Sequence, residues 1–368
     1  MKAKAAIFVE ERKPLVIDEI TVDGPREGEV LVKLTATGIC HTDLHEMSGN
    51  ANNPLMPAVL GHEGAGMVVE VGPGVRSLKE GDHVIPLFIP ECGECPQCRS
   101  PLTNLCSAID DTLEIGMMPD GTSRLHWRGR ELHHFMGTST FAEYTVVPEI
   151  AAAKVRPDAP LDRLGLLGCG ITTGVGAALW TAGVTEGATT AVFGCGPIGL
   201  SAVQGCRLAG ASQVIALDLH EERLEMARLM GATHTINAAQ EDGVSAVKQL
   251  TDGGADFTFE ATGNTEVMRQ AFEACRYGGG KCCLIGVAAK GKELCVVPRM
   301  LISGRSLTGT AFGGCSGRSQ LPELVDWYME GRLKVDELVT EFIALEEINE
   351  ALEKMKRDEG YRYIVRYE

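Results

Sequence analysis

Apolar and polar positions alternate along the first part of the chain, as they do in strands whose two faces meet different surroundings. In residues 29–38, for example, Val30, Val32 and Leu34 fall on one face. A glycine-rich stretch at 61–66 indicates a turn that leads into a further strand. The expected strands in this part are residues 3–9, 29–38, 67–71 and 84–87. Many short strands separated by turns predict an irregular antiparallel β domain through about residue 155.

From residue 164 the pattern changes, because apolar runs and helical periodicities now follow one another in alternation. The expected strands are residues 191–193, 213–217, 233–236, 257–260 and 281–285, and the expected helices are 198–209 and 221–230. This rhythm predicts an α/β domain in which a doubly wound parallel sheet carries helices on both faces. The tail is expected to add helices at 323–329 and 346–355 and a final short strand.

The two patterns divide the chain into two domains. We expect residues 1–170 and 315–368 to form the first and residues 171–314 to form the second. A chain of 368 residues is long enough for two such domains.

Composition and charge argue against several classes of protein. The chain has 50 acidic and 34 basic residues and a net charge of −16, so neither nucleic acid nor an anionic membrane is expected as a partner. The apolar run at 5–9 is too short for a signal sequence, and no run of about 20 apolar residues is present. We therefore expect a cytoplasmic protein.

Four of the thirteen cysteines lie close together in the sequence. Cys92, Cys95, Cys98 and Cys106 have the spacing C-x2-C-x2-C-x7-C. Four thiolates so near one another suit the closed tetrahedral site of a structural zinc ion. An iron–sulfur cluster is one alternative, although the gap of seven residues fits common ferredoxin spacings poorly. A loop of reduced cysteines is another, although exposed thiols would invite oxidation.

A second set of metal-binding residue types is scattered along the chain. Cys40 follows a predicted strand, His62 lies in the glycine-rich stretch, and Cys169 stands where the two patterns meet. A catalytic zinc ion needs three protein ligands and one open position, which two cysteines and one histidine can supply. Each residue alone is weak support, because a lone buried cysteine usually packs in a core and a lone histidine usually forms hydrogen bonds.

The order of these motifs resembles that of the zinc-containing medium-chain alcohol dehydrogenases. The resemblance covers nearly the whole chain and rests on the stretches 40–43 (CHTD) and 61–66 (GHEGAG), the four-cysteine lobe and Cys169. It implies a GroES-like irregular β domain for catalysis and a Rossmann sheet that binds NAD. A zinc-free reductase relative with the same fold is the alternative, but such relatives usually lack both cysteine sets.

The same resemblance assigns roles to residues of the scattered set. It implies that Cys40, His62 and Cys169 hold the catalytic zinc ion. Glu63 would lie close by as a transient further ligand, and Asp43 would orient His62.

A glycine loop predicts a dinucleotide site. Gly194, Gly196 and Gly199, with Ile198 among them, follow a predicted strand and open a predicted helix, which is the context that gives G-x-G-x-x-G its meaning. A strand–helix turn that merely uses glycines is the alternative. Asp218 argues against it, since it ends the next strand, where a carboxylate can bind the ribose hydroxyls and repel a 2′-phosphate. We therefore expect NAD and not NADP.

Further cofactor contacts are implied by the resemblance alone. Arg223 would lie near the adenosine ribose, Thr173 and Val287 would flank the nicotinamide, and His41 and Arg362 would reach the pyrophosphate. An ordinary surface arginine is the alternative for Arg362, because the matching stretch of the tail is short.

Two residues offer a route for the proton that an alcohol loses on oxidation. By the resemblance, the Thr42 hydroxyl would accept the proton of the alcohol at the metal, and the relay would continue through the nicotinamide ribose to His45. An imidazole that is neutral near pH 7 suits the end of such a relay. A solvated surface histidine is the alternative.

The closest resemblance within the family is to the class III branch, which oxidises S-(hydroxymethyl)glutathione. It is carried by residues 118–124, 137–141, 252–256 and 325–331. The branch's substrate pocket is not matched: Asp110 stands where the branch has an arginine that holds a glutathione carboxylate, and 50–54 lacks its acidic residues.

Apolar residues would line the pocket instead. Phe88, Phe135, Met136 and Val287 favour hydrophobic alcohols, at roughly 0.8 kcal/mol per buried methylene. We therefore expect a primary aliphatic or aromatic alcohol or its aldehyde as substrate. S-(hydroxymethyl)glutathione is the alternative, and a non-catalytic protein that keeps the fold is a remote one. Plain core packing is the alternative role for each of these side chains.

The oligomeric state follows from one expected strand. Residues 307–312 could pair across a twofold axis and extend the sheet, as they do in relatives, so a homodimer is expected.

Overall fold

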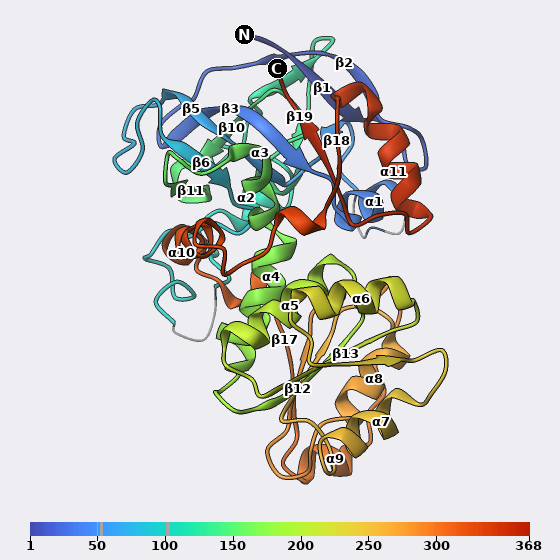
Figure 1. Ribbon diagram of the computed structural model, residues 1–368. Coiled ribbons are helices and arrows are strands. Elements are labelled where there is room, and N and C mark those ends of the chain that lie inside the picture. Colours follow the sequence, from blue (N-terminus) through green and yellow to red (C-terminus); the bar gives the residue numbers. More distant parts are fainter. Residues whose placement is uncertain (50, 52–53, 101–103) are drawn as a thin grey trace. The chain divides into compact units, whose positions relative to one another are not determined.

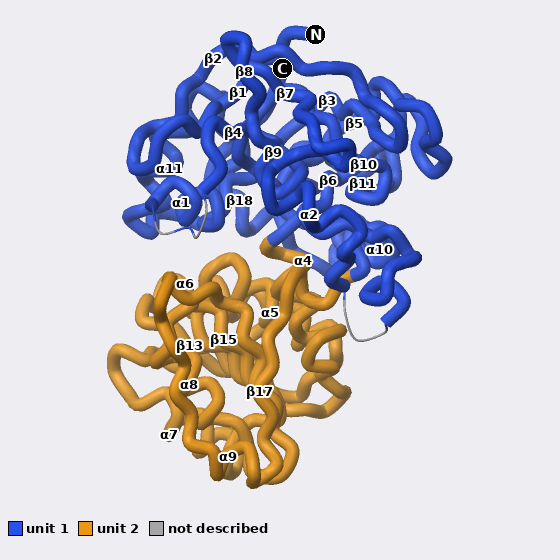
Figure 2. The backbone as a smooth tube through the Cα atoms, turned by 180° about the vertical axis from the view of Figure 1, so that it is seen from behind, with its two compact units in different colours: residues 1–169, 316–368 blue, residues 170–315 orange. Residues whose placement is uncertain are grey.

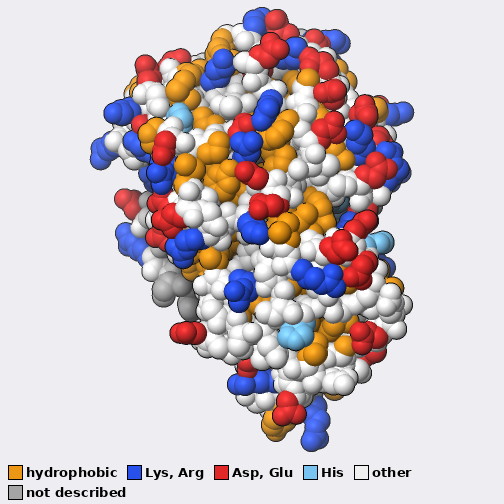
Figure 3. Space-filling model, in the orientation of Figure 1, with side chains coloured by type: hydrophobic (Ala, Val, Ile, Leu, Met, Phe, Trp, Pro, Cys, Tyr) orange, Lys and Arg blue, Asp and Glu red, His pale blue; other side chains and the backbone are white. Residues whose placement is uncertain are grey.

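The computed structural model describes residues 1–49, 51, 54–100 and 104–368. The chain forms two compact units, Met1–Cys169 with Ser316–Glu368 and Gly170–Cys315 (Figure 2). On the face shown in Figure 3, acidic and basic side chains are interspersed. Among the described residues no single helix is long and apolar enough to cross a membrane. One bent pair of helical segments, Leu161–Gly168 with Gly170–Ala182, is long and apolar enough when judged by length and composition alone.

The first unit is built on two mainly antiparallel sheets (Figure 1). One sheet has the order β8-β7-β2-β1-β4-β9 and contains β1 (Lys2–Phe8), β2 (Val16–Val22), β4 (Ala58–Val59), β7 (Leu125–Trp127), β8 (Arg130–Glu131) and β9 (His133–His134). The other has the order β11-β6-β5-β3-β19-β18, with β10 also paired to β3, and contains β3 (Glu29–Gly38), β5 (Glu63–Val71), β6 (His83–Pro86), β10 (Tyr144–Pro148), β11 (Ala152–Val155), β18 (Val339–Ile343) and β19 (Arg362–Arg366).

Helices of the first unit are mostly short. They are α1 (His41–Met47), α2 (Asp110–Leu113), α3 (Leu161–Leu164), α10 (Gly317–Met329) and α11 (Ile348–Lys356). We expected a helix at 323–329, but α10 begins six residues earlier and continues through Pro322. Leu44 of α1 and Leu352 of α11 join strand residues, Phe8, Ile20 and Val365 among them, in one buried core.

The glycine-rich stretch that we expected to form a turn lies mainly in a strand. β5 begins at Glu63 and pairs with β3, with Gly64 opposite Thr37 and Gly66 opposite Leu34. A Cβ atom on Gly66 would lie 2.1 Å from the Lys33 carbonyl oxygen, so the missing side chain lets the two backbones approach. Gly66 therefore serves strand packing, whereas Gly61, with φ +86°, lies just before the strand.

The second unit is an all-parallel six-stranded sheet with the order β14-β13-β12-β15-β16-β17. Its strands are β12 (Thr189–Phe193), β13 (Gln213–Asp218), β14 (His234–Asn237), β15 (Phe257–Glu260), β16 (Lys281–Leu284) and β17 (Ser306–Gly309). Its helices are α4 (Gly170–Gly176), α5 (Pro197–Leu208), α6 (Glu221–Met230), α7 (Gly243–Leu250), α8 (Thr265–Glu273) and α9 (Pro298–Ile302), with a π-helical turn at Ala177–Ala182. The predicted doubly wound fold is confirmed, because the strand order reverses direction on either side of β12.

Candidate active site and metal centres

The four-cysteine lobe has the geometry of a closed metal site. The Sγ atoms of Cys92, Cys95, Cys98 and Cys106 all lie within 4.8 Å of one another. Two of the pairs, Cys92 with Cys98 and Cys95 with Cys106, are 3.9 Å apart. A tetrahedral zinc ion with Zn–S bonds of about 2.3 Å separates its sulfurs by about 3.8 Å. A disulfide would need about 2.05 Å, so this is a structural zinc site.

Backbone amides of the lobe point at its sulfurs. Glu94 and Cys95 donate N–H groups to Cys92 Sγ at 3.4 and 3.3 Å, and Cys98 donates to Cys95 Sγ at 3.4 Å. N–H donors stabilise thiolate over thiol. The donation from Cys98 is the largest of the effects that lower the pKa of Cys95, to about 6. These N–H groups therefore favour the thiolate of Cys95, whereas burial raises the pKa of the Cys98 and Cys106 thiols.

The scattered residues form a second, buried cluster. Cys40, His62, Glu63 and Cys169 each place one ligand atom within 4.8 Å of the others, and all four are buried. Cys40 precedes α1, His62 lies directly before β5 and Glu63 begins it, and Cys169 follows the 3-10 turn Gly165–Gly168. The fold thus joins three segments that are far apart in the sequence.

One buried carboxylate holds two of these segments together. Asp43 Oδ2 accepts the backbone N–H of Cys40 at 3.0 Å, and its Oδ1 accepts that of Gly61 at 3.1 Å. The same Oδ1 lies 3.3 Å from His62 Nδ1. Asp43 is fully buried. Its contact with the imidazole directs the other ring nitrogen of His62 toward the cysteines.

The Nε2 atom of His62 shows that the cluster fits a metal ion. His62 Nε2 is buried and has no hydrogen-bond partner. A buried polar atom without a partner costs free energy unless something binds it. A hydrogen bond from the Cys169 thiol, together with the nearby His62, also holds the pKa of the Cys40 thiol well below its usual value. One imidazole nitrogen and two sulfurs form the donor set of a catalytic zinc site.

Glu63 and Arg362 lie beside this cluster. Burial raises the pKa of the Glu63 carboxyl to about 7, against the opposing charge of Arg362. Arg362 Nη2 lies 3.4 Å from Glu63 Oε1, and its Nη1 donates to the Ile39 carbonyl at 3.3 Å. Arg362 is 2% exposed, so the structure buries the residue that we expected at the pyrophosphate. Its contact with the cofactor stays a prediction.

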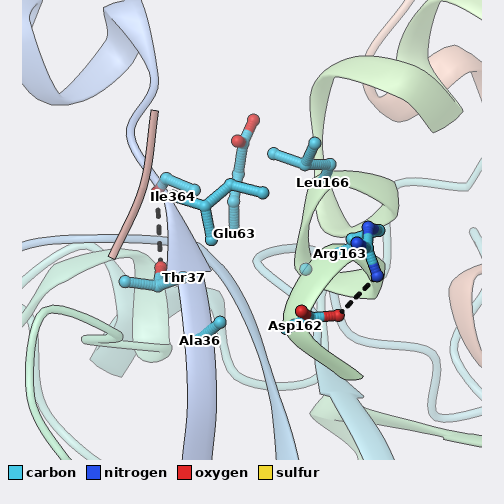
Figure 4. Close-up of a pocket in the computed structure, with 9 residues that line it drawn as sticks. Ala36, Thr37, Glu63, Asp162, Arg163, Leu166 and Ile364 are labelled. Atoms are coloured by element: carbon cyan, nitrogen blue, oxygen red, sulfur yellow. Dashed lines mark hydrogen bonds and ion pairs between the residues drawn. The ribbon is translucent and has the colours of Figure 1, made fainter. Parts of the chain in front are cut away.

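A small pocket is lined by Glu63, Leu166 and Ile364 (Figure 4). In Figure 4 the Glu63 side chain stands between Leu166 and Ile364, and its carboxylate points away from Ala36. Gly38 also lines the pocket. A Cβ atom on Gly38 would come within 2.5 Å of Glu63 Oε2, so the carboxylate occupies space that a side chain would take. Gly38 was not singled out from the sequence.

Two aromatic rings pack edge-on against His62. The Phe88 ring centroid is 6.0 Å and that of Phe135 5.9 Å from the imidazole centroid. The adjoining Met136 has φ +51°, a left-handed conformation that non-glycine residues rarely adopt. Of the expected pocket residues, Phe88 and Phe135 therefore contact the metal-site histidine.

The two residues of the expected proton relay lie on α1. Thr42 is exposed, and its Oγ1 lies 3.6 Å from Cys40 Sγ. His45 is half-buried and lies three residues further along the helix. His41, expected at the pyrophosphate, is exposed at the start of the same helix.

The glycine loop of the second unit has the shape that a dinucleotide site requires. Gly194 has φ +94°, and Gly196 precedes α5, whose first residue is Pro197. A Cβ atom on Gly199 would lie 1.8 Å from the Gly194 carbonyl oxygen, whereas one on Gly196 would meet nothing within 4 Å. The backbone at Gly196 is thus open to a phosphate at the start of α5, where Ile198 is half-buried.

Asp218 ends β13 beside this loop. Its Oδ2 accepts the backbone N–H of Cys195 at 2.7 Å, and its Oδ1 accepts those of Leu219 and His220 at 2.8 and 3.1 Å. The carboxylate therefore braces the glycine loop, and its bond to the ribose stays a prediction. Of the other expected contacts, Thr173 is 9% exposed in α4, Val287 is 82% exposed after β16, and Arg223 is half-buried in α6.

The residues by which we expect this chain to differ from the class III branch lie at the surface or outside the described part. Asp110 is exposed at the start of α2. Leu113 of the same helix would contact a Cβ atom on Gly137, two residues after Phe135. Asn50, Asn52 and Asn53 lie outside the described residues.

Comparisons with known proteins agree with this site. Residues 26–157 match the alcohol dehydrogenase GroES-like domain family, and residues 197–330 match the zinc-binding dehydrogenase family. The chain is 51% identical to an alcohol dehydrogenase class-3 of Cereibacter sphaeroides, over 99% of this chain and all of that one. It is 49% identical to an S-(hydroxymethyl)glutathione dehydrogenase of Paracoccus denitrificans, over the whole of both.

A solved structure has the same fold. The benzyl alcohol dehydrogenase of Acinetobacter calcoaceticus is 36% identical, with a TM-score of 0.93 over the whole of both chains. The chain therefore belongs to the zinc-containing medium-chain alcohol dehydrogenases. Within that family it is about half identical, over its full length, to class III enzymes, and it is a zinc-dependent, NAD-linked oxidoreductase that acts on CH–OH groups.

Proposed function

We propose that the chain reversibly oxidises the CH–OH group of a hemithioacetal or primary alcohol with NAD at the cluster of Cys40, His62 and Cys169. The observation that carries this proposal is the buried, unpartnered Nε2 of His62, which lies among two thiols. When bound, a zinc ion there supplies the positive charge that favours loss of the alcohol's proton. Glu63 serves as the transient further ligand.

The chain's own residues handle the proton and the orientation of the site. Asp43 keeps the imidazole of His62 turned toward the cysteines. The Thr42 hydroxyl accepts the alcohol's proton and passes it on, and His45 delivers it to solvent. Both residues are on α1, which begins directly after Cys40.

The second unit binds the dinucleotide. The open backbone at Gly196 and the start of α5 hold the pyrophosphate. Asp218 binds the adenosine ribose and disfavours a 2′-phosphate, and Arg223 lies near the ribose. Thr173 and Val287 flank the nicotinamide, and His41 and Arg362 contact the pyrophosphate. These assignments lead us to propose NAD over NADP.

S-(hydroxymethyl)glutathione is the substrate that the relatives support best. Proteins 47–51% identical over essentially the whole chain carry that name or the class III name. The likeness extends over both units and both metal clusters, so we place this substrate first. Our sequence-based preference for an apolar alcohol has less support from the comparisons.

A primary aliphatic or aromatic alcohol is the second candidate, and two observations favour it. The rings of Phe88 and Phe135 contact His62 and would surround a hydrophobic substrate, with Met136 beside them. The exposed Asp110 would repel the carboxylates of glutathione. The likeness to a benzyl alcohol dehydrogenase also supports an aromatic substrate.

Turnover of S-(hydroxymethyl)glutathione, hexanol and benzyl alcohol by the purified enzyme decides between the candidates. A higher kcat/KM for the glutathione adduct supports the first, and a higher value for the plain alcohols overturns it. Asp110→Arg should raise kcat/KM for the adduct about tenfold, or about 1.4 kcal/mol, and leave benzyl alcohol unchanged. Asp111→Arg, which changes the neighbouring exposed carboxylate, is the matched control.

We also propose that the enzyme is a cytoplasmic homodimer. β17 is an outer strand in the order of the parallel sheet, and its residues are mostly exposed. Such an edge can pair with a second copy. Light scattering of the purified chain should give twice the mass of 39.3 kDa, and the mass of a single chain would refute the dimer.

A further inference from the structure

A buried glutamate at the end of a central strand has no role in the proposed reaction. Glu260 is the last residue of β15 and is fully buried. Its strand partners are Phe193 of β12, which leads into the glycine loop, and Leu284 of β16. Ligands of doubly wound folds bind at the carboxyl ends of the strands, so Glu260 stands at that edge.

Glu260 joins the two loops that follow β15 and β16. Its Oε1 accepts the backbone N–H groups of Thr262 and Gly263 at 2.6 and 2.9 Å, and it also accepts the Thr262 hydroxyl. Its main-chain carbonyl accepts the N–H groups of Ile285 and Gly286 at 2.8 and 3.0 Å. One residue thus fixes the backbone of both loops.

The two loops pack backbone against backbone. A Cβ atom on Gly263 would lie 2.4 Å from the Val287 carbonyl oxygen, and one on Gly286 would lie 2.1 Å from Gly263 N. No side chain fits between them. A shift of the Thr262–Gly263 turn would therefore move Val287, whose side chain is 82% exposed.

The stability of the fold alone does not account for a carboxylate at this place. Glu260 Oε2 is buried without a hydrogen-bond partner. Burial also raises the pKa of this carboxyl above its usual value, although its three donors oppose the shift. A buried polar atom left unpaired costs free energy. The cost is understandable if the bonds to Oε1 serve ligand binding.

The strand order indicates which part of the dinucleotide is affected. Asp218 ends β13, on one side of β12, and Glu260 ends β15, on the other side. A dinucleotide laid across the end of β12, with its adenosine at Asp218, directs its nicotinamide toward β15 and β16.

We propose that Glu260 is a positioning residue that holds the loop bearing Val287 in the shape that receives the nicotinamide half of NAD. The inference rests on the proposed function, which assigns Val287 to the nicotinamide. Glu260 itself does not touch the cofactor.

The test compares binding of NADH with binding of ADP-ribose, which lacks the nicotinamide, by calorimetry on the zinc-loaded enzyme. Glu260→Ala should raise the Kd for NADH about tenfold and leave that for ADP-ribose within about twofold. Glu260→Gln keeps an oxygen acceptor and should restore NADH binding. Thr258→Val, two residues earlier in the same strand, is the matched control and should leave both Kd values unchanged, because the Thr258 hydroxyl bonds the Ala271 carbonyl and neither loop.

Several results would overturn the inference. Glu260→Ala could bind NADH like the wild type, or it could lose NADH and ADP-ribose equally, which would make the carboxylate a support for the whole unit. If Glu260→Ala does not fold, Thr262→Val removes one donor to the same oxygen and should still weaken NADH binding selectively; equal loss of both ligands in that variant refutes the inference. Failure of the wild type to bind NADH would instead refute the proposed function.

Discussion

The two cysteine-containing clusters of this chain place similar donor atoms in opposite surroundings. Cys92, Cys95, Cys98 and Cys106 come from one short segment, and three of the four are partly exposed. Cys40, His62, Glu63 and Cys169 come from distant segments and are all buried. The first set offers four sulfurs and is complete, whereas the second offers two sulfurs and one nitrogen, with a carboxylate nearby.

The number of segments that contribute ligands indicates the role of each cluster. A site made by one segment can fold around its ion with few other contacts, so that metal binding and local folding are one event. A site made by three segments requires the surrounding fold to be complete first. In return, the fold can place Asp43 behind the histidine and two aromatic rings beside it. Removing a residue from each cluster should therefore have different consequences.

The largest effect on activity is expected for His62→Ala. Loss of the imidazole removes the second metal site, and with it several kcal/mol of stabilisation of the reacting oxygen. NADH formation, followed at 340 nm, should fall at least about a thousandfold. Zinc analysis should find one ion per chain in place of two, and the thermal midpoint should change little. A variant that kept two zinc ions would break the assignment.

Cys106→Ser should show the reverse pattern. Loss of one sulfur opens the lobe, and if this costs about 3 kcal/mol, the thermal midpoint falls by roughly 6–12 °C. At temperatures well below the midpoint, activity should be reduced far less than in His62→Ala. Ser107→Ala, beside it in sequence, is the control. An activity loss as deep as that of His62→Ala at an unchanged midpoint would contradict the structural role.

Asp43→Asn sharpens the comparison, because in the buried cluster a carboxylate contacts a metal-binding side chain. The amide keeps the shape but cannot balance the charge on the imidazole and loses an acceptor for one backbone N–H. Affinity for zinc at this cluster should fall about 10–100-fold, while the lobe keeps its ion. Competition with a chromophoric chelator measures both sites, and equal weakening of the two would count against the role of Asp43.

The smallest effect is expected for Gly38→Ala. The new methyl group would crowd Glu63 Oε2 and Leu166, so the carboxylate must shift. We expect kcat to change by about threefold to tenfold, with the zinc content kept at two. Gly24→Ala is the control, since its methyl group would meet only the end of the Glu70 side chain, at 3.4 Å. An unchanged kcat in Gly38→Ala would mean that the pocket leaves room for Glu63 to adjust.

The sequence alone predicts the four-cysteine lobe, whereas it predicts the buried cluster only through a family resemblance. The reason is physical. The lobe is readable from spacing, because four ligands of one short segment must lie close together. The ligands Cys40, His62 and Cys169 are distant in sequence, and only their resemblance to a family joined them. The parallel sheet was predicted because buried strands alternate with helices, a pattern that is local.

The features that the sequence did not predict depend on packing between distant segments. Gly38 matters because Glu63 fills the space beside it, and Glu260 matters because two loops meet there. The stretch 61–66 was expected to be a turn, but of its glycines only Gly61, with φ +86°, lies before the strand, and Gly66 provides close approach to β3. Arg362 lies buried beside Glu63, a contact that no spacing could reveal.

The most direct test asks whether one metal site has an open position and the other does not. The enzyme is loaded with cobalt in place of zinc, and its visible absorption is recorded while imidazole, a simple metal ligand, is added. We predict a saturable change of the cobalt bands in the wild type and no change in His62→Ala, which keeps only the metal of the lobe. Bands that respond equally in His62→Ala, or that do not respond in the wild type, would contradict the account.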